Sequence, residues 1–316
     1  MHVISASRRT DIPAFYCDWL MSRVRTGFAR WRNPYSGEPG EVSLRRGDVA
    51  AVVFWSKNYT PLLPHLPELD SLGWGMCFQF TITGLPKVFE PEVPPAESMV
   101  ECARLLAERY TPEAVLWRYD PILISSVTDV QYHIARFREL ASALEGVTTR
   151  CYFSFPNLYA RVVRNMQALK AKLGIECFEI PLRQRMETAA ELAQIAAEYG
   201  IEMYSCCGEY LVGGMIKKAH CVDGPLLCRL FPDRIGRIRE RRTRKECGCY
   251  ESVDIGVYDT CPHGCVYCYA NMNKETASAR HQAHDPAADT LAGDSGLGDS
   301  PSSRAYDPQM RMDLGD

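Results

Sequence analysis

Three cysteines in the last fifth of the chain have the spacing of a compact metal-binding loop. Cys261, Cys265 and Cys268 follow the pattern C-x-x-x-C-x-x-C, and Gly264 between them permits a tight turn. Structural zinc takes four protein ligands and a cubane iron–sulfur cluster is normally held by four thiolates, so three thiolates leave one metal corner open. A substrate or cofactor could bind at this open coordination position. Alternatively, His263 inside the loop could complete a Cys3His zinc site.

Four more cysteines form a looser group that precedes this loop. They are Cys206, Cys221, Cys247 and Cys249. Four thiolates could close a fully ligated [4Fe-4S] cluster or a zinc site, with Cys207 or Cys228 as substitute ligands, and scattered structural thiols are a third interpretation. Residues 208–272 are rich in Gly, Cys and Arg with little periodicity, so a metal would help this segment to fold.

The composition is that of a globular protein that uses cysteine for metal or redox chemistry. Fourteen cysteines without a secretory signal argue against a disulfide scaffold, because a reducing cytosol keeps thiols free. No apolar run approaches the ~18 residues of a membrane-spanning helix, and we expect a cytoplasmic protein without membrane contact. The net charge of −3 and the pI near 6.2 predict no strong attraction to nucleic acid.

One basic stretch departs from this average. Residues 229–245 carry eight basic side chains against two acidic ones, with Glu246 directly after them, and this stretch could bind the phosphates of nucleic acid. The alternative is a solvated, salt-bridged helix that faces an acidic tail. That tail, residues 276–316, has few large apolar residues, and we expect it to be disordered.

Short β-rich runs alternate with helical periodicity along the first two thirds of the chain. The predicted strands are Val3–Ala6, Val49–Trp55, Met76–Thr83, Ala114–Tyr119, Arg150–Phe155 and Ile201–Cys206. The predicted helices are Pro13–Arg25, a proline-broken stretch after Pro61, Ala96–Tyr110, Val130–Leu144, Tyr159–Leu173 and Glu187–Tyr199. This alternation predicts an α/β fold, a partial (β/α)6 TIM-like barrel over residues 1–206, followed by a cysteine-rich segment over 207–275.

In such barrels the polar residues just past the strand ends form the active face. The charged candidates for catalytic or substrate contacts are Arg8, Arg9, Asp11, Arg118 and Asp120. The candidates for cofactor contacts are Ser56, Lys57, Asn58, Ser154 and Tyr267. A purely structural ion pair between Arg118 and Asp120 is the alternative for those two residues.

The cysteine loop, with Tyr267 before its last cysteine, resembles the cluster loop of radical S-adenosylmethionine (SAM) enzymes, which also have a six-fold partial barrel. In those enzymes the loop commonly follows the first strand, whereas here it lies near the C-terminus. Together with the segments 5–13, 117–122 and 254–258 (SASRRTDIP, WRYDPI and DIGVY), the chain resembles the bacterial domain-of-unknown-function 1848 family. The resemblance covers residues 1 to about 285.

The resemblance implies a [4Fe-4S] cluster on Cys261, Cys265 and Cys268, with SAM on the fourth iron and an auxiliary cluster in the second cysteine group. It also implies reductive cleavage of SAM, radical chemistry on an unidentified small-molecule or nucleotide substrate, and an electron donor such as flavodoxin or ferredoxin. Ser56, Lys57 and Asn58 stand where such enzymes commonly carry a Gly-Gly-Glu segment that holds SAM. Two other functions remain open. They are a non-catalytic iron–sulfur protein for redox or ligand binding and a zinc-stabilised nucleic-acid-binding module.

Overall fold

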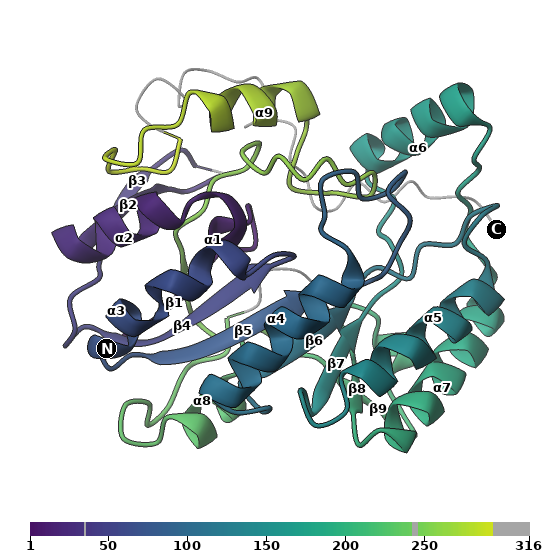
Figure 1. Ribbon diagram of the computed structural model, residues 1–316, viewed down its shortest axis with the longest axis horizontal. Coiled ribbons are helices and arrows are strands. Elements are labelled where there is room, and N and C mark those ends of the chain that lie inside the picture. The colour runs from purple at the N-terminus through teal and green to yellow at the C-terminus, as the bar shows by residue number, and fades with distance from the viewer. Residues whose placement is uncertain (35, 242–245, 293–316) are drawn as a thin grey trace.

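A central parallel sheet of eight strands, flanked by helices, organises the chain (Figure 1). The computed structural model describes residues 1–34, 36–241 and 246–292. The strands of the large sheet are β1 (His2–Ala6), β4 (Val49–Ser56), β5 (Gly75–Thr81), β6 (Val115–Tyr119), β7 (Arg150–Phe153), β8 (Glu202–Ser205), β9 (Ile216–Lys218) and β10 (Val253–Asp254). The α/β class predicted from the sequence is confirmed.

The strand order is β10-β1-β4-β5-β6-β7-β8-β9, and every neighbouring pair is parallel. All six predicted strands are present. The two edge strands, β9 and β10, were not predicted, because two or three residues are too few to show a period. Both come from the segment after Cys206, so this cysteine-rich part of the chain extends the sheet at each edge.

The helices are α1 (Ile12–Phe15), α2 (Cys17–Thr26), α3 (Leu66–Ser71), α4 (Ala96–Arg109), α5 (Val130–Ala143), α6 (Ala160–Leu173), α7 (Leu182–Glu198), α8 (Gly224–Leu230) and α9 (Lys274–Gln282), with 3-10 turns η1 (Thr60–His65) and η2 (Glu209–Leu211). The helix predicted over Pro13–Arg25 is two helices, separated at Tyr16. A hairpin of β2 (Phe28–Arg32) and β3 (Pro39–Ser43) lies between α2 and β4 and was not predicted.

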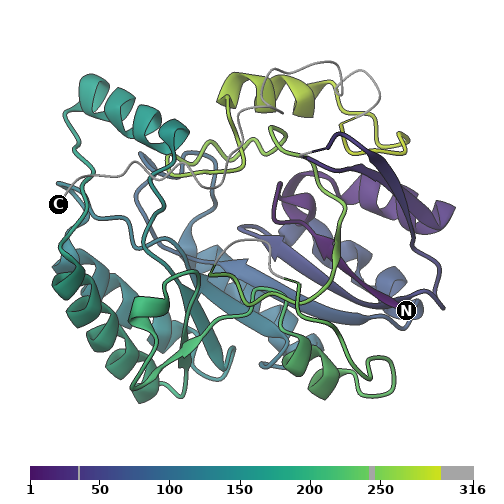
Figure 2. The same cartoon turned by 180° about the vertical axis from the view of Figure 1, so that it is seen from behind.

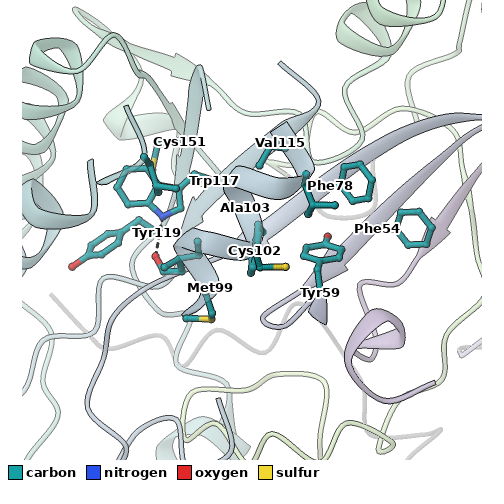
Figure 3. Packing of buried hydrophobic residues seen from close by; sticks show 14 of the residues in the cluster. Phe54, Tyr59, Phe78, Met99, Cys102, Ala103, Val115, Trp117, Tyr119 and Cys151 are labelled. Carbon is teal, nitrogen blue, oxygen red and sulfur yellow. Dashed lines mark hydrogen bonds between the residues drawn. The ribbon is translucent and has the colours of Figure 1, made fainter. Parts of the chain in front are cut away.

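The two faces of the sheet pack against different partners. On β4, Val52 and Phe54 face the helices, whereas Ala51 and Val53 pack with the apolar residues of 219–238. Figure 3 shows part of the helix side, where Phe78 and Trp117 lie with Met99, Cys102 and Ala103 of α4 in an apolar cluster that also includes Phe54. Figure 2 shows the segment that follows β8 passing over the opposite face. The cysteine-rich segment therefore packs on the face of the sheet opposite the helices in Figure 3.

Residues 276–292 are ordered, which corrects the expectation that the tail is disordered from residue 276. The end of α9 and the residues after it pack on α2, where Trp19 Nε1 donates to the carbonyl of Ala288 at 2.9 Å. Arg23, a buried side chain, donates to Asp289 at 2.7 Å, and Leu291 is 1% exposed. Polar contacts to a buried arginine, which composition does not reveal, hold this segment. Residues 293–316 lie outside the described part of the chain.

The basic stretch begins in α8 but does not continue as a helix, since residues 231–241 form turns and irregular backbone. Arg229 pairs with Glu113 at 3.2 Å and Arg241 with Glu251 at 3.3 Å, so two of its charges are matched locally. Residues 242–245 are outside the described ranges. Among the helices that are described, none has the length and apolarity needed to cross a membrane.

Candidate functional site

The carboxyl ends of the strands surround a pocket of about 250 Å³. The predicted site residues that line it are Arg8, Arg9, Asp11, Ser56, Lys57, Arg118, Asp120, Ser154, Tyr267 and the seven cysteines Cys206, Cys221, Cys247, Cys249, Cys261, Cys265 and Cys268. Asn58 is the exception. Its Oδ1 accepts a hydrogen bond from the Thr60 backbone at 3.1 Å, so this side chain holds the start of η1 instead of the pocket wall.

The three-cysteine loop lies along this edge and is fixed by contacts with other loops and with its own flank. Lys274 donates to the carbonyl of Gly264 at 2.6 Å, and Gly264 has φ +68°, a left-handed conformation that glycine adopts without strain. The Val266 backbone N–H donates to Phe89 at 2.9 Å. The loop is therefore anchored on one side by the connection between β5 and α4, which contains Phe89, and on the other side by the start of α9.

The three thiols sit in surroundings that suit a metal-bound thiolate more than a free one. Burial raises the pKa of Cys265 to about 12 and that of Cys261 well above its usual range, so without a bound cation both stay protonated. Burial also raises the pKa of Cys268, against the backbone N–H groups of Ala270 and Asn271, which favour the thiolate. Ala270 N lies 3.4 Å from Cys268 Sγ. A metal ion would displace these protons and accept the sulfur ligands.

His263 is occupied by oxygen partners. Its Nε2 lies 2.8 Å from Asp11 Oδ2 and its Nδ1 lies 3.3 Å from the carbonyl of Glu92. Asp11 also accepts from Ser56 Oγ at 2.6 Å and from the Lys57 backbone N–H at 2.8 Å. Because each ring nitrogen of His263 already has an oxygen partner, this arrangement does not favour the Cys3His zinc alternative.

Glu90 is a site residue that the sequence did not reveal, because it stands in a long connection without periodicity. It is 2% exposed, and its Oε1 accepts from Lys57 Nζ at 2.8 Å, from Thr83 at 2.8 Å and from the Tyr267 hydroxyl. Burial acts to lower the pKa of Lys57, but Glu90, Cys265 and Asp120 together outweigh it and the pKa is raised. Lys57 therefore remains a cation beside the cysteine loop, 5.5 Å from the centroid of the Tyr267 ring.

Asp254 in β10 organises the loop after β1. It accepts from Ser5 Oγ at 2.8 Å, from Ser7 Oγ at 2.6 Å and from the Arg8 backbone at 2.9 Å. Burial acts to raise the pKa of Asp254, but Arg9 and Arg8 outweigh it and the pKa is lowered. The sequence motif 254–258 marked this position without giving its role, which is to fix the two arginines at the pocket edge.

The second cysteine group converges on the same pocket. Cys206 directly follows β8, and its Sγ lies 3.2 Å from Cys221 Sγ, while Cys247 and Cys249 are 2.8 Å apart. Cys207 lines the pocket beside them. Of the two substitute ligands considered, Cys228 lies elsewhere, 3.8 Å from the carbonyl of Gly236.

The Sγ–Sγ distances in this group, 3.2 Å and 2.8 Å, are shorter than those between the sulfur ligands of a metal centre. Tetrahedral zinc with Zn–S bonds of ~2.3 Å would separate its sulfurs by ~3.8 Å. Consistently, within residues 1–34, 36–241 and 246–292 no set of three or more His, Cys, Asp or Glu side chains is spaced to hold a metal ion. The donor types and their convergence fit a thiolate-ligated centre, and binding would require the thiols to separate.

The fold and the site together define an α/β protein with a cysteine-lined pocket at the carboxyl edge of a parallel sheet. Residues 3–270 match the family described as domain of unknown function (DUF1848), and the chain belongs to that family. The match spans β1 through the last cysteine of the loop, so it includes both cysteine groups. No curated protein matches the chain.

Proposed function

We propose that the protein is a radical SAM-type enzyme. In this proposal the sheet is a partial (β/α)6 barrel over residues 1–206, and residues 207–275 are its iron–sulfur segment. A [4Fe-4S] cluster is held by Cys261, Cys265 and Cys268, and SAM occupies its open iron. A second, fully ligated cluster is held by Cys206, Cys221, Cys247 and Cys249.

One observation carries the proposal. Two cysteine groups that are separate in sequence line a single pocket, and one of them offers only three thiols. Three thiolates on a cubane leave one iron for another ligand, whereas four thiolates close it. The pocket lies where parallel α/β proteins bind substrates, at the carboxyl ends of the strands.

The residues of the chain have separate tasks in this proposal. When bound, the open cluster supplies an electron for cleavage of SAM, which starts radical chemistry on the substrate. Lys57, held by Glu90, places a positive charge beside the cysteine loop. Asp11 fixes the backbone that follows β4 and, through His263, the cysteine loop itself. Trp55 and Tyr159 add aromatic walls that exclude water from the pocket.

The substrate in this proposal is a small molecule or a nucleotide that reaches the pocket, with Arg8, Arg9 and Arg118 as its polar contacts. The electron comes from a separate donor protein such as flavodoxin or ferredoxin. A nucleic-acid substrate would engage the basic stretch 229–245, of which Arg229 and Arg241 are already paired with glutamates.

The test is electron paramagnetic resonance (EPR) of the anaerobically reconstituted protein, reduced with dithionite and measured with and without SAM. We expect a reduced-cluster signal that changes when SAM is added, and formation of 5′-deoxyadenosine. The variant Cys268→Ala should lack the SAM-responsive signal. A cluster signal indifferent to SAM would instead support the non-catalytic iron–sulfur protein. Colourless protein with stoichiometric zinc would support the zinc-stabilised nucleic-acid-binding module.

A further inference from the structure

Arg118 presents a buried guanidinium to the second cysteine group. It extends from β6 and is 7% exposed, 5.2 Å from the Trp55 ring centroid and 5.9 Å from that of Tyr152. Its NH1 donates to Cys221 Sγ at 3.8 Å and to Gln79 Oε1 at 3.2 Å. The aromatic rings and Gln79 thus fix the direction in which this cation points.

A second guanidinium, that of Arg8, lines the same pocket as these thiols. Arg8 is held at its backbone by Asp254 and by Tyr269, whose hydroxyl donates to the Arg8 carbonyl at 2.8 Å. Burial acts to lower the pKa of Arg8, but Asp254, Cys249 and Cys221 outweigh it and the pKa is raised. Asp254 is the largest of the contributions that keep Arg8 a cation.

Each of the two arginines also forms an ion pair with a carboxylate, and the distance between the charged groups is shorter for Arg118 than for Arg8. Arg118 pairs directly with Asp120, which is in turn held by Ser154. Arg8 Nε is 3.5 Å from Asp254, a carboxylate that several other donors share. Four thiolates in one buried site are costly unless cations face them, and the Arg118 guanidinium, which contacts Cys221, is positioned to do so.

We propose that Arg118 is the charge partner that sets the reduction potential of the centre held by Cys206, Cys221, Cys247 and Cys249. This rests on the proposed function, which places an iron–sulfur cluster there. Net charge and hydrogen bonds to the sulfurs are two of the factors that set cluster potentials. Reduction adds one electron to the cluster, so a facing cation and an N–H donor stabilise the reduced form and raise the potential. Asp120 opposes this effect by neutralising part of the Arg118 charge.

The test is an EPR-monitored potentiometric titration of the reconstituted full-length chain that follows the signal unaffected by SAM. Arg118→Gln should lower the midpoint potential of that signal, and Asp120→Asn should raise it. Arg118→Lys keeps the charge and should stay closer to wild type than Arg118→Gln. Arg109→Gln, which removes an exposed guanidinium paired with Asp70 on α3, is the matched control and should leave the potential unchanged.

The opposite signs of the two shifts separate this role from a structural one, since mere loosening of the site would not raise the potential in one variant and lower it in the other. If Arg118→Gln does not fold, the midpoint potential of Asp120→Asn alone tests the proposal. Unchanged midpoints in the folded variants would overturn the proposal, as would zinc in place of iron at the second group. The SAM response of the other signal tests the proposed function independently.

Discussion

The Nε2 atom of His263 lies 2.8 Å from Oδ2 of Asp11, although 252 residues separate them in the chain. Both side chains are buried. The contact joins the cysteine loop to the loop after β1, and the same carboxylate holds the backbone after β4 through Lys57. One carboxylate therefore sets the relative position of three loops around the pocket.

Asp11→Ala should lower the free energy of unfolding by about 3 kcal/mol, because it leaves several buried donors, including His263, without their acceptor. Urea denaturation of the metal-free protein measures this. The control is Glu187→Ala, which breaks an exposed i,i+4 pair with Arg183 and should leave the free energy of unfolding nearly unchanged. Equal losses in the two variants would show that the Asp11 contacts do not stabilise the fold.

Each of Cys261→Ala, Cys265→Ala and Cys268→Ala should abolish SAM cleavage while the sheet stays folded. The reason is that a cubane with two remaining thiolates from the chain is not retained. The assay is formation of 5′-deoxyadenosine, with far-ultraviolet circular dichroism to confirm folding. Cys102→Ala, in the buried face of α4, is the control and should keep cleavage. Cleavage retained in any one of the three loop variants would remove the cluster assignment.

Cys247→Ala should lower the iron content from about eight to about four per chain, since the second group loses one of its four thiolates. We expect solubility to fall with it and SAM affinity to change less. Iron analysis and SAM titration measure the two effects. Cys228→Ala provides the comparison, because its thiol lies apart from the group, and an iron count equal in both variants would rule out the auxiliary cluster.

Stability should fall as the pH drops from about 7.5 to 5.5, in part through His133. Burial lowers the pKa of His133, and the neutral ring is satisfied by the Tyr119 hydroxyl at 2.8 Å and the Leu123 carbonyl at 2.9 Å. In the unfolded chain His133 takes up a proton below its ordinary pKa of ~6.5, whereas in the folded chain it does not, so the stabilisation is present above that pH and lost below it.

His133→Gln should flatten the dependence of the urea midpoint on pH. His281 and His284, whose pKa values burial also lowers, leave a residual slope. A profile as steep as wild type would contradict the assignment.

Asp289→Ala should loosen residues 286–292 without unfolding the sheet. The change leaves Arg23 buried without its carboxylate, at a cost of about 2 kcal/mol. Amide hydrogen exchange measures it, with faster exchange expected at Arg30, whose N–H donates to the Asp289 carbonyl at 3.0 Å. Glu275→Ala, an exposed change in the first turn of α9, should leave exchange there unaltered.

Much of the sheet was predictable because strands such as Val49–Ser56 are long, apolar and bounded by turn residues. The lining residues at the strand ends were predictable too, because residues just past parallel strands meet at one edge of the sheet. The position of Arg118 and Asp120 at the carboxyl end of β6 predicts this placement. The two side chains form an ion pair and also line the pocket, and their role in substrate contact stays a prediction.

What the sequence left hidden depends on contacts between distant segments. Glu90 and Asp254 are single carboxylates in stretches with no helical or strand period, and their importance comes from donors far away in the chain. Asn58 was predicted from its neighbours, but its Oδ1 accepts a hydrogen bond from the Thr60 backbone and does not line the pocket. The ordered part of the tail owes its position to Arg23 and Trp19, which no local pattern connects to it.

The short strand β10 pairs with β1, the first strand of the chain, and carries the segment that leads into the cysteine loop. During synthesis, six of the eight strands emerge before any of the seven candidate ligands, and β9 emerges before all of them except Cys206. Seven strands of the sheet are therefore made before the edge strand β10, which covers the free edge of β1. In the proposed function, cluster loading is in consequence a late step of maturation, one that a chain truncated after β8 could not undergo.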